Sequence, residues 1–217
     1  MGQKVNPTGF RTGTFLPWKS RWFADDARYK EYLLEDIKIR RALMGKFILA
    51  GITLVEIERL PKNIVITMHV SRPGVVIGRG GSGIEEVKKL IQKIIRESRK
   101  GQVGDIKIDP KVVEVKNAEL SAHLIATRIA AELERRMPHR RVVNRAIERI
   151  MQSGALGVKV ILSGRIGGAD ISRVEKYHLG SVPAQTLREV IDYAQVPALL
   201  KKGYVGVKVY IHKKPEE

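Results

Sequence analysis

Four glycines lie within the six residues Gly78-Arg79-Gly80-Gly81-Ser82-Gly83, and the segments on either side of them restrict the fold more than any other feature. The apolar run Val75-Val76-Ile77 precedes this cluster. Apolar residues at helical spacing follow it, namely Ile84, Val87, Leu90, Ile91, Ile94 and Ile95. Such a stripe predicts an amphipathic helix over about residues 82–99. The glycine cluster therefore joins a strand-like run to a helix.

The elements around the glycine cluster predict one α+β unit over residues 29–116. Apolar residues at near-helical spacing favour a helix over 29–50. Two β-type runs follow at 53–59 and 63–70, and the second alternates between apolar and polar residues, as expected for one arm of a hairpin over a core. A last strand is expected over 105–115. The predicted order is helix, strand, strand, helix, strand.

Three interpretations of the glycine cluster are open. The simplest is a flexible turn whose glycines start a helix. The second is a dinucleotide-binding fold, because Gly78, Gly80 and Gly83 match the spacing G-x-G-x-x-G. That fold needs an acidic residue at the end of the next strand, whereas Glu97 lies in a basic helix and Asp105 at a strand start. The third, which we favour, is a K-homology (KH) motif, whose G-x-x-G loop clamps nucleotide backbone.

The KH interpretation has a physical basis in close approach. Without Cβ atoms, the backbone N–H groups of the loop and of the helix N-terminus can face phosphates directly. Arg79 adds a cation, and the flanking residues 75–77 and Ile84 would form an apolar floor for bases. A free-standing KH regulatory or processing factor would carry the same loop. The predicted RNA contacts are Gly78, Arg79, Gly80, Gly81, Lys88 and Lys89.

Residues 117–217 predict a second α+β unit, with two helices on a four-stranded antiparallel sheet. Asn117 is the expected N-cap of a helix that runs to about Arg136. Pro138 breaks this helix, and a second one continues to Ser153-Gly154. Four β-type runs follow, near 156–163, 169–178, 186–194 and 204–212.

The expected domains are a basic N-terminal arm at 1–28, a KH RNA-binding domain at 29–116 and an α+β domain at 117–217. The arm is rich in glycine, proline and basic residues. Its aromatic residues Trp18, Trp22 and Phe23 are expected to dock it in part.

The charge of the chain points to a polyanionic partner. The 217 residues include 40 Lys and Arg against 23 Asp and Glu, a formal net charge of +17. Self-repulsion of this size strains a compact state unless a polyanion lies against it. No stretch approaches the ~20 apolar residues that span a bilayer, so we expect no membrane partner. Nucleic acid is the better match.

Arginines gather between the two helices of the second unit. Residues 135–149 carry six Arg against the single Glu148. Arg141, Arg145 and Arg149 follow at i, i+4 and i+8, so they form one stripe on a helix. A solvated basic face is the plain alternative, but few acids are present to pair with these arginines, whose planar forks suit phosphate oxygens. The predicted backbone-contacting patch is Arg135, Arg136, Arg140, Arg141, Arg145 and Arg149.

The sequence argues against catalysis. There is no cysteine, and the five histidines show no metal-ligand spacing. Neither a G-x-S-x-G elbow nor a Walker-type G-x-x-x-x-G-K-[ST] loop is present. We expect no metal, no cofactor, no small-molecule substrate and no enzymatic activity.

Several segments together resemble one family, the third protein of the small ribosomal subunit in its bacterial or organellar form. The opening run Met1-Gly2-Gln3-Lys4-Val5-Asn6-Pro7-Thr8-Gly9-Phe10-Arg11 resembles that family's start. Further matching motifs are Arg72-Pro73-Gly74-Val75-Val76-Ile77-Gly78, Leu133-Glu134-Arg135-Arg136, Ser163-Gly164-Arg165-Ile166-Gly167-Gly168-Ala169 and Gly206-Val207-Lys208-Val209-Tyr210-Ile211. The resemblance runs essentially end to end.

The resemblance implies a type II KH domain followed by an α+β domain, in the head of the small subunit of a cytoplasmic or organellar ribosome. Members of the family contact rRNA and help form the mRNA entrance beside ribosomal proteins four and five, with ribosomal proteins ten and fourteen as neighbours. Basic residues there are associated with mRNA unwinding; the matching positions are Arg140, Arg141 and Asn144, with Arg145 next along. In the arm, the expected rRNA contacts are Lys4, Arg11, Lys19 and Arg21.

Overall fold

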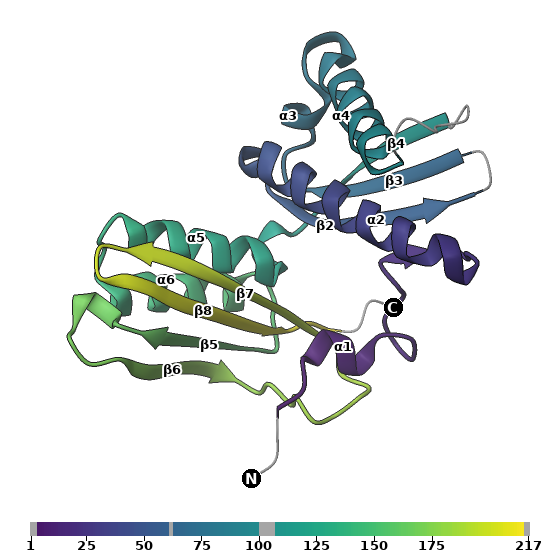
Figure 1. Cartoon of the computed structure of the whole chain (residues 1–217). Coiled ribbons are helices and arrows are strands. Elements are labelled where there is room, and N and C mark those ends of the chain that lie inside the picture. Colours follow the sequence, from purple (N-terminus) through teal and green to yellow (C-terminus); the bar gives the residue numbers. More distant parts are fainter. Residues whose placement is uncertain (1–3, 61–62, 100–106, 215–217) are drawn as a thin grey trace. The chain divides into compact units, whose positions relative to one another are not determined.

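The computed structural model describes residues 4–60, 63–99 and 107–214. The chain forms two compact units (Figure 1). The central unit is Trp18–Lys116, and the C-terminal unit joins Met1–Pro17 to Asn117–Glu217. Residues 1–28, expected to form one arm, are therefore divided between the two units after Pro17.

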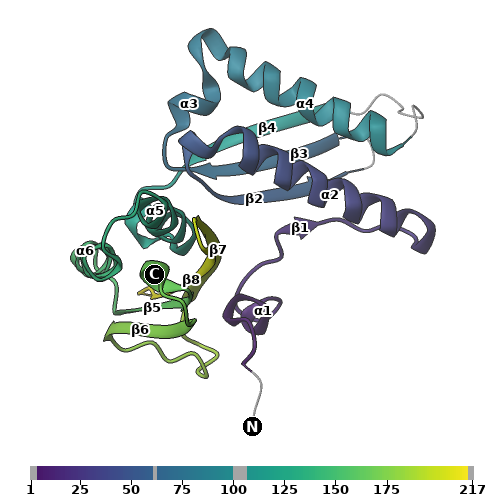
Figure 2. The ribbon, with the colours of Figure 1, turned by 60° about the vertical axis from the view of Figure 1, so that its left-hand side comes forward.

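A four-stranded sheet forms the base of the central unit. Its order is β1 (Ser20–Arg21), β2 (Ile52–Arg59), β3 (Asn63–Val70) and β4 (Lys107–Glu114). β2 and β3 are antiparallel, whereas β1 is parallel to β2 and β4 is parallel to β3. The helices α2 (Asp26–Lys46) and α4 (Ser82–Ser98) lie on one face of the sheet (Figure 2). Because parallel neighbours need a crossover connection, α4 is what allows β4 to pair with β3.

The alternation predicted for the second hairpin strand is confirmed in β3. Its residues Ile64, Ile66, Met68 and Val70 are buried and share one core with α2 and α4. Each such side chain contributes about 1.5–3 kcal/mol when fully buried. A one-residue slip of β3 would turn all four toward solvent, so this face fixes the register.

The strand-like interpretation of Val75-Val76-Ile77 is wrong, because these residues belong to a short helix, α3 (Pro73–Ile77). Pro73 stands in its first turn, where the missing N–H is not needed. The 3₁₀ turns η1 (Ile48–Ala50) and η2 (Arg79–Gly81) follow α2 and α3. The first two residues of the strand predicted at 105–115 lie outside the described residues.

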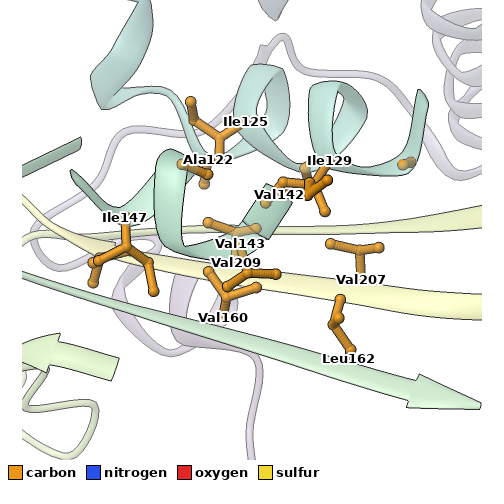
Figure 3. Close-up of a cluster of buried hydrophobic side chains, with 14 of the residues drawn as sticks. Ala122, Ile125, Ile129, Val142, Val143, Ile147, Val160, Leu162, Val207 and Val209 are labelled. Atoms are coloured by element: carbon orange, nitrogen blue, oxygen red, sulfur yellow. The ribbon is translucent and has the colours of Figure 1, made fainter. Parts of the chain in front are cut away.

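The C-terminal unit is built on an antiparallel sheet in the order β6 (Arg173–Gly180), β5 (Gly157–Gly164), β8 (Gly203–His212) and β7 (Ile191–Leu200). The helices α5 (Ala122–Glu134) and α6 (His139–Gln152) cover one face of it. Apolar side chains from both helices meet those of β5 and β8 in one core (Figure 3). The unit also holds α1 (Pro7–Arg11), η3 (Ala118–Leu120) and η4 (Ile166–Gly168). Two helices on a four-stranded antiparallel sheet is the architecture predicted from the sequence.

Two boundaries of the C-terminal unit differ from expectation. The first long helix begins at Ala122 rather than after Asn117, and the N–H of Ala122 donates to Asp192 Oδ2 of β7 at 3.1 Å. The strand predicted at 186–194 lies at Ile191–Leu200. Among the described residues, no helix combines the length and apolar character needed to cross a bilayer.

Candidate nucleic-acid interface

The glycine loop has a backbone that only glycine adopts easily. Gly78, Gly80 and Gly81 have φ angles of 71°, 62° and 82°. Side chains are rarely tolerated in this left-handed region, because Cβ crowds the neighbouring carbonyl. Three such angles in four residues turn the chain sharply between α3 and α4. Arg79 alone carries a side chain there, and it is exposed.

The glycines of this loop serve two different purposes. A Cβ on Gly83 would lie 2.2 Å from the carbonyl oxygen of Val76, and one on Gly78 would lie 2.8 Å from the nitrogen of Gly83. These two glycines let the end of α3 pack against the start of α4. A Cβ on Gly80 or Gly81 would meet nothing within 4 Å. The outer side of the loop is thus open, so a phosphate can approach its backbone N–H groups.

Cations outnumber anions beside the loop. Lys88 and Lys89 are exposed on α4, and neither they nor Arg79 has an ion pair among the described residues. Glu86 on the same helix is hydrogen-bonded to Lys46 at 2.8 Å. That bond lowers the pKa of Glu86 below its ordinary value. Its charge is therefore partly balanced within the protein.

The apolar floor expected next to the loop is formed in part. Val75 and Ile77 of α3 are 47% and 38% exposed, whereas Val76 is buried in the core. Ile84 is half-buried. The side chains of Val75 and Ile77 thus remain available to a base, whereas that of Val76 anchors α3 in the core.

The arginine stripe on α6 has the geometry that its spacing predicts. Arg141, Arg145 and Arg149 are exposed. The buried side of the helix consists of Val142, Val143, Ala146, Ile147 and Ile150. In the part of the chain that the structure describes, no ion pair involves any of the three arginines. Their guanidinium groups are therefore free to bind phosphate oxygens.

The turn between α5 and α6 presents two further arginines. Arg135 and Arg136 are both exposed, and Arg136 has a φ of 61°. The N–H of Arg136 donates to the Leu133 carbonyl at 2.9 Å, and the N–H of Met137 donates to the Glu132 carbonyl at 3.2 Å. These bonds close α5 with a left-handed residue, a position that glycine usually occupies.

Arg140, at the start of α6, lies beside a polar cluster on β6. Glu175 accepts hydrogen bonds from Tyr177 and Arg173, and it is 3.1 Å from His139 Nε2. The Tyr177 hydrogen bond is the main reason that the pKa of Glu175 is lowered. Burial raises the pKa of Tyr177, and the charge of Arg140 opposes that shift.

The four arm cations have different surroundings. Lys4 and Lys19 are exposed, and Arg21 pairs with Glu58 at 3.2 Å on the surface. Arg11 is only 1% exposed, and its guanidinium donates to backbone carbonyls of α1 and of the segment before β7. Burial lowers its pKa. The expectation that Arg11 contacts rRNA is therefore wrong in this structure, because its donors are already satisfied inside the protein.

A buried ionic cluster in the central unit has no signal in the sequence. Glu35 and Asp36 of α2 are fully buried. Arg59 donates to both carboxylates, and Arg99 donates to Glu35 at 2.7 Å. Trp22 donates to Asp36 at 2.8 Å, which docks the segment before α2. The cluster holds α2 against β2 and the end of α4. Among the described residues, no group of three or more His, Asp or Glu side chains is arranged so that it could hold a metal ion.

A glycine loop of this kind on an α-β-β-α-β unit defines a KH-type RNA-binding protein, and the exposed arginines of α6, which have no ion pair among the described residues, agree with that class. Residues 38–120 match the KH domain family, and residues 129–211 match the family described as Ribosomal protein S3, C-terminal domain. The chain is 47% identical to the small ribosomal subunit protein uS3 of Caldicellulosiruptor saccharolyticus and 46% identical to that of Caldicellulosiruptor bescii. Identity to the same protein of Clostridium perfringens is 44%. Each match covers 98% of this chain and 92% of the relative.

The chain belongs to the family of small ribosomal subunit protein uS3. The resemblance drawn from the sequence motifs and the predicted fold class are confirmed. This family consists of ribosomal structural proteins rather than enzymes, in agreement with the absence of catalytic motifs.

Proposed function

We propose that the chain is a structural constituent of the small-subunit head, where it binds rRNA and helps form the entrance for mRNA. It also aids the unwinding of structured mRNA during translation. The proposal is supported by the likeness to uS3 relatives over nearly the whole chain. We further propose a ribosome-associated location in the cytoplasm, or in an organelle that has its own ribosomes.

The observation that carries the message-handling part is the set of exposed arginines at the start of α6, which have no ion pair among the described residues. Three positions of this chain match the basic residues that the family resemblance associates with mRNA unwinding. Arg140 and Arg141 occupy the first two, and the exposed Asn144 occupies the third. An amide supplies no charge there. Arg145 is the next residue and is exposed on the same helix. We assign the third cationic contact to it.

The rRNA contacts are assigned to the other exposed cations among the residues predicted from the sequence. They are Arg79, Lys88 and Lys89 beside the glycine loop, Arg135, Arg136 and Arg149 around α6, and Lys4, Lys19 and Arg21 near the N-terminus. The open backbone at Gly80 and Gly81 adds N–H donors to this set. Ribosomal proteins ten and fourteen, and four and five at the mRNA entrance, are the proposed protein neighbours. The KH domain at 29–116, the α+β domain at 117–217 and the basic segment before them are the proposed functional divisions.

Sedimentation of cell lysates that contain the tagged chain tests this function. We expect the chain to be recovered mainly in small-subunit fractions. Subunits that carry the triple substitution R140Q, R141Q and R145Q should assemble but translate hairpin-containing mRNA more slowly than unstructured mRNA. The charge-matched control is R28Q, K30Q and R41Q, three exposed positions on α2. Recovery mainly outside small-subunit fractions, or an equal effect of the two triple variants, would overturn the proposal.

A further inference from the structure

The sheet of the C-terminal unit has a second face, opposite α5 and α6, which we call the open face. Both helices lie on one side of the sheet (Figure 2). The residues that point toward them, such as Val160, Leu162, Val207 and Val209, form the core. Because side chains alternate along a strand, the intervening residues of all four strands point the other way.

The strand register places the residues of the open face in rows. Cross-strand partners share a face, so each row runs from β6 through β5 and β8 to β7. The first row is His178, Lys159, Tyr210 and Tyr193. The second row is Lys176, Ile161, Lys208 and Gln195, and the third is Val174, Ser163, Gly206 and Pro197.

These rows carry cations without any carboxylate. None of Lys159, Lys176 and Lys208 has an ion pair among the residues that the structure describes. The acidic residues of the same strands, Glu175 and Asp192, alternate with these rows and point toward the helices. There Asp192 accepts a hydrogen bond from the Ala122 N–H, and Glu175 lies 3.1 Å from His139 Nε2. Lysines in neighbouring rows of one sheet face repel one another. A bound polyanion would remove that repulsion.

Tyrosines lie among these lysines. The rings of Tyr193 and Tyr210 are 4.7 Å apart at an interplanar angle of 45°. Tyr204 has the same parity as Tyr210 on β8, and it is 67% exposed. A four-stranded sheet that is backed by two helices and offers aromatic rings and cations is a platform on which unpaired bases stack.

One end of the open face is covered by the protein itself. His212 and Ile191, which would begin the next row, are buried. His212 contacts the Ser181 carbonyl and Glu189, and α1 packs near the start of β7 through Arg11. The lysine rows and Tyr204 lie beyond this covered end.

We propose that the open face binds single-stranded RNA, with Tyr193, Tyr204 and Tyr210 stacking bases and Lys159, Lys176 and Lys208 contacting phosphates. This site lies on the opposite side of the sheet from the α6 arginines. It deepens the proposed function, on which it rests for the choice of RNA as the polyanion. Its RNA is a second segment, distinct from the one at α6.

Ultraviolet cross-linking of the full chain to a 12-nucleotide oligouridine locates the contact without any substitution. We expect peptides from β7 and β8 that contain Tyr193, Tyr204 or Tyr210 to carry uridine adducts. Adducts confined to residues 73–98 or to α6 would overturn the proposal. This experiment is separate from the sedimentation test of the proposed function. A chain that sediments with the small subunit but forms no adducts at these tyrosines would contradict the open-face site alone.

A lysine variant measures the phosphate contacts. At about 0.1 M salt, each lost contact to a single strand lowers affinity roughly fivefold. The triple substitution K159Q, K176Q and K208Q should therefore weaken oligouridine binding by about 100-fold, and relief of repulsion should leave the melting temperature unchanged or higher. The control K201Q, K202Q and K214Q removes equal charge from the same unit outside the strand rows. Equal losses of oligouridine affinity in both variants would overturn the proposal. In assembled subunits, a footprint in which a neighbouring protein and no RNA protects Lys159, Lys176 and Lys208 would also overturn it.

Discussion

The Nε of Arg11 donates a hydrogen bond to the backbone carbonyl of Glu189 at 2.7 Å, across 178 residues of sequence. The same guanidinium donates to the carbonyls of Pro7 and Thr186 at 3.0 and 2.7 Å. This arginine therefore joins the N-terminal helix to the segment that leads into β7. It acts as a structural residue within a highly basic chain.

Replacement of Arg11 by alanine should destabilise the C-terminal unit by about 2–4 kcal/mol, because several buried or partly buried carbonyls lose at once the donors of one buried guanidinium. Hydrogen exchange of the β7 and β8 amides measures this change without contribution from the central unit. Binding of RNA at the α6 arginines should be unaffected. Unchanged exchange rates in R11A would contradict the structural role.

The buried cluster of Glu35, Asp36 and Arg59 should be highly sensitive to loss of one partner. The substitution D36N leaves the Arg59 guanidinium with only part of its compensation, and breaking a buried pair typically costs about 3–5 kcal/mol. Tryptophan fluorescence during urea unfolding reports on it, since Trp22 donates to Asp36. The surface pair of Arg21 and Glu58 is the control, because E58Q should cost less than about 1 kcal/mol. Similar losses of unfolding free energy in D36N and E58Q would contradict the greater sensitivity of the buried cluster.

Two glycines of the loop should respond differently to alanine. At Gly83 the new Cβ would meet backbone at 2.2 Å, so G83A must displace α3 and should cost several kcal/mol. At Gly80 the space is open and only the positive φ is unfavourable, so G80A should cost about 1–2 kcal/mol. Thermal unfolding distinguishes the two. A larger loss for G80A than for G83A would contradict the division between packing and open glycines.

Glu175 should make the C-terminal unit less stable in acid. Its pKa is lowered in the folded protein, mainly by the Tyr177 hydrogen bond. Its contribution is therefore complete above the unfolded value of about 4.3 and is lost as the pH falls through the folded value. We expect E175Q to show a smaller decrease in stability than the parent between about pH 6 and pH 3. The exposed Glu148 is the control, and an equal effect of E148Q would contradict this origin.

Periodicity predicted the parts of the fold that one buried face determines. The alternation of β3 and the apolar stripe of α4 were readable, because each residue's burial depends on its own element. The strand at 191–200 was placed too early, since its open-face residues Tyr193, Gln195 and Pro197 interrupt the apolar pattern. Asn117 was a reasonable cap for a helix, but η3 intervenes and Asp192 supplies a distant acceptor to Ala122.

Long-range polar contacts were not predictable from the sequence. Arg11 donates hydrogen bonds to backbone carbonyls. Because every residue carries a carbonyl, no pattern of side chains in the sequence predicts these bonds. Glu35 and Asp36 look like ordinary charges on an exposed helix until Arg59 and Arg99 come together around them. The candidate surface residues were easier to find. Clustered arginines without acidic neighbours remain visible in the sequence, and no ion pair to Arg141, Arg145 or Arg149 is found within the described ranges.

The most direct test of the RNA-binding account is the salt dependence of the binding of single-stranded mRNA by the α6 arginines. For single-stranded contacts, the slope of log affinity against log salt should fall by roughly 0.7 for each phosphate contact that is removed. The triple substitution R140A, R141A and R145A should therefore lower the slope by about 2 relative to the parent chain. A slope equal to that of the parent would show that these arginines do not contact phosphate, and it would contradict the account.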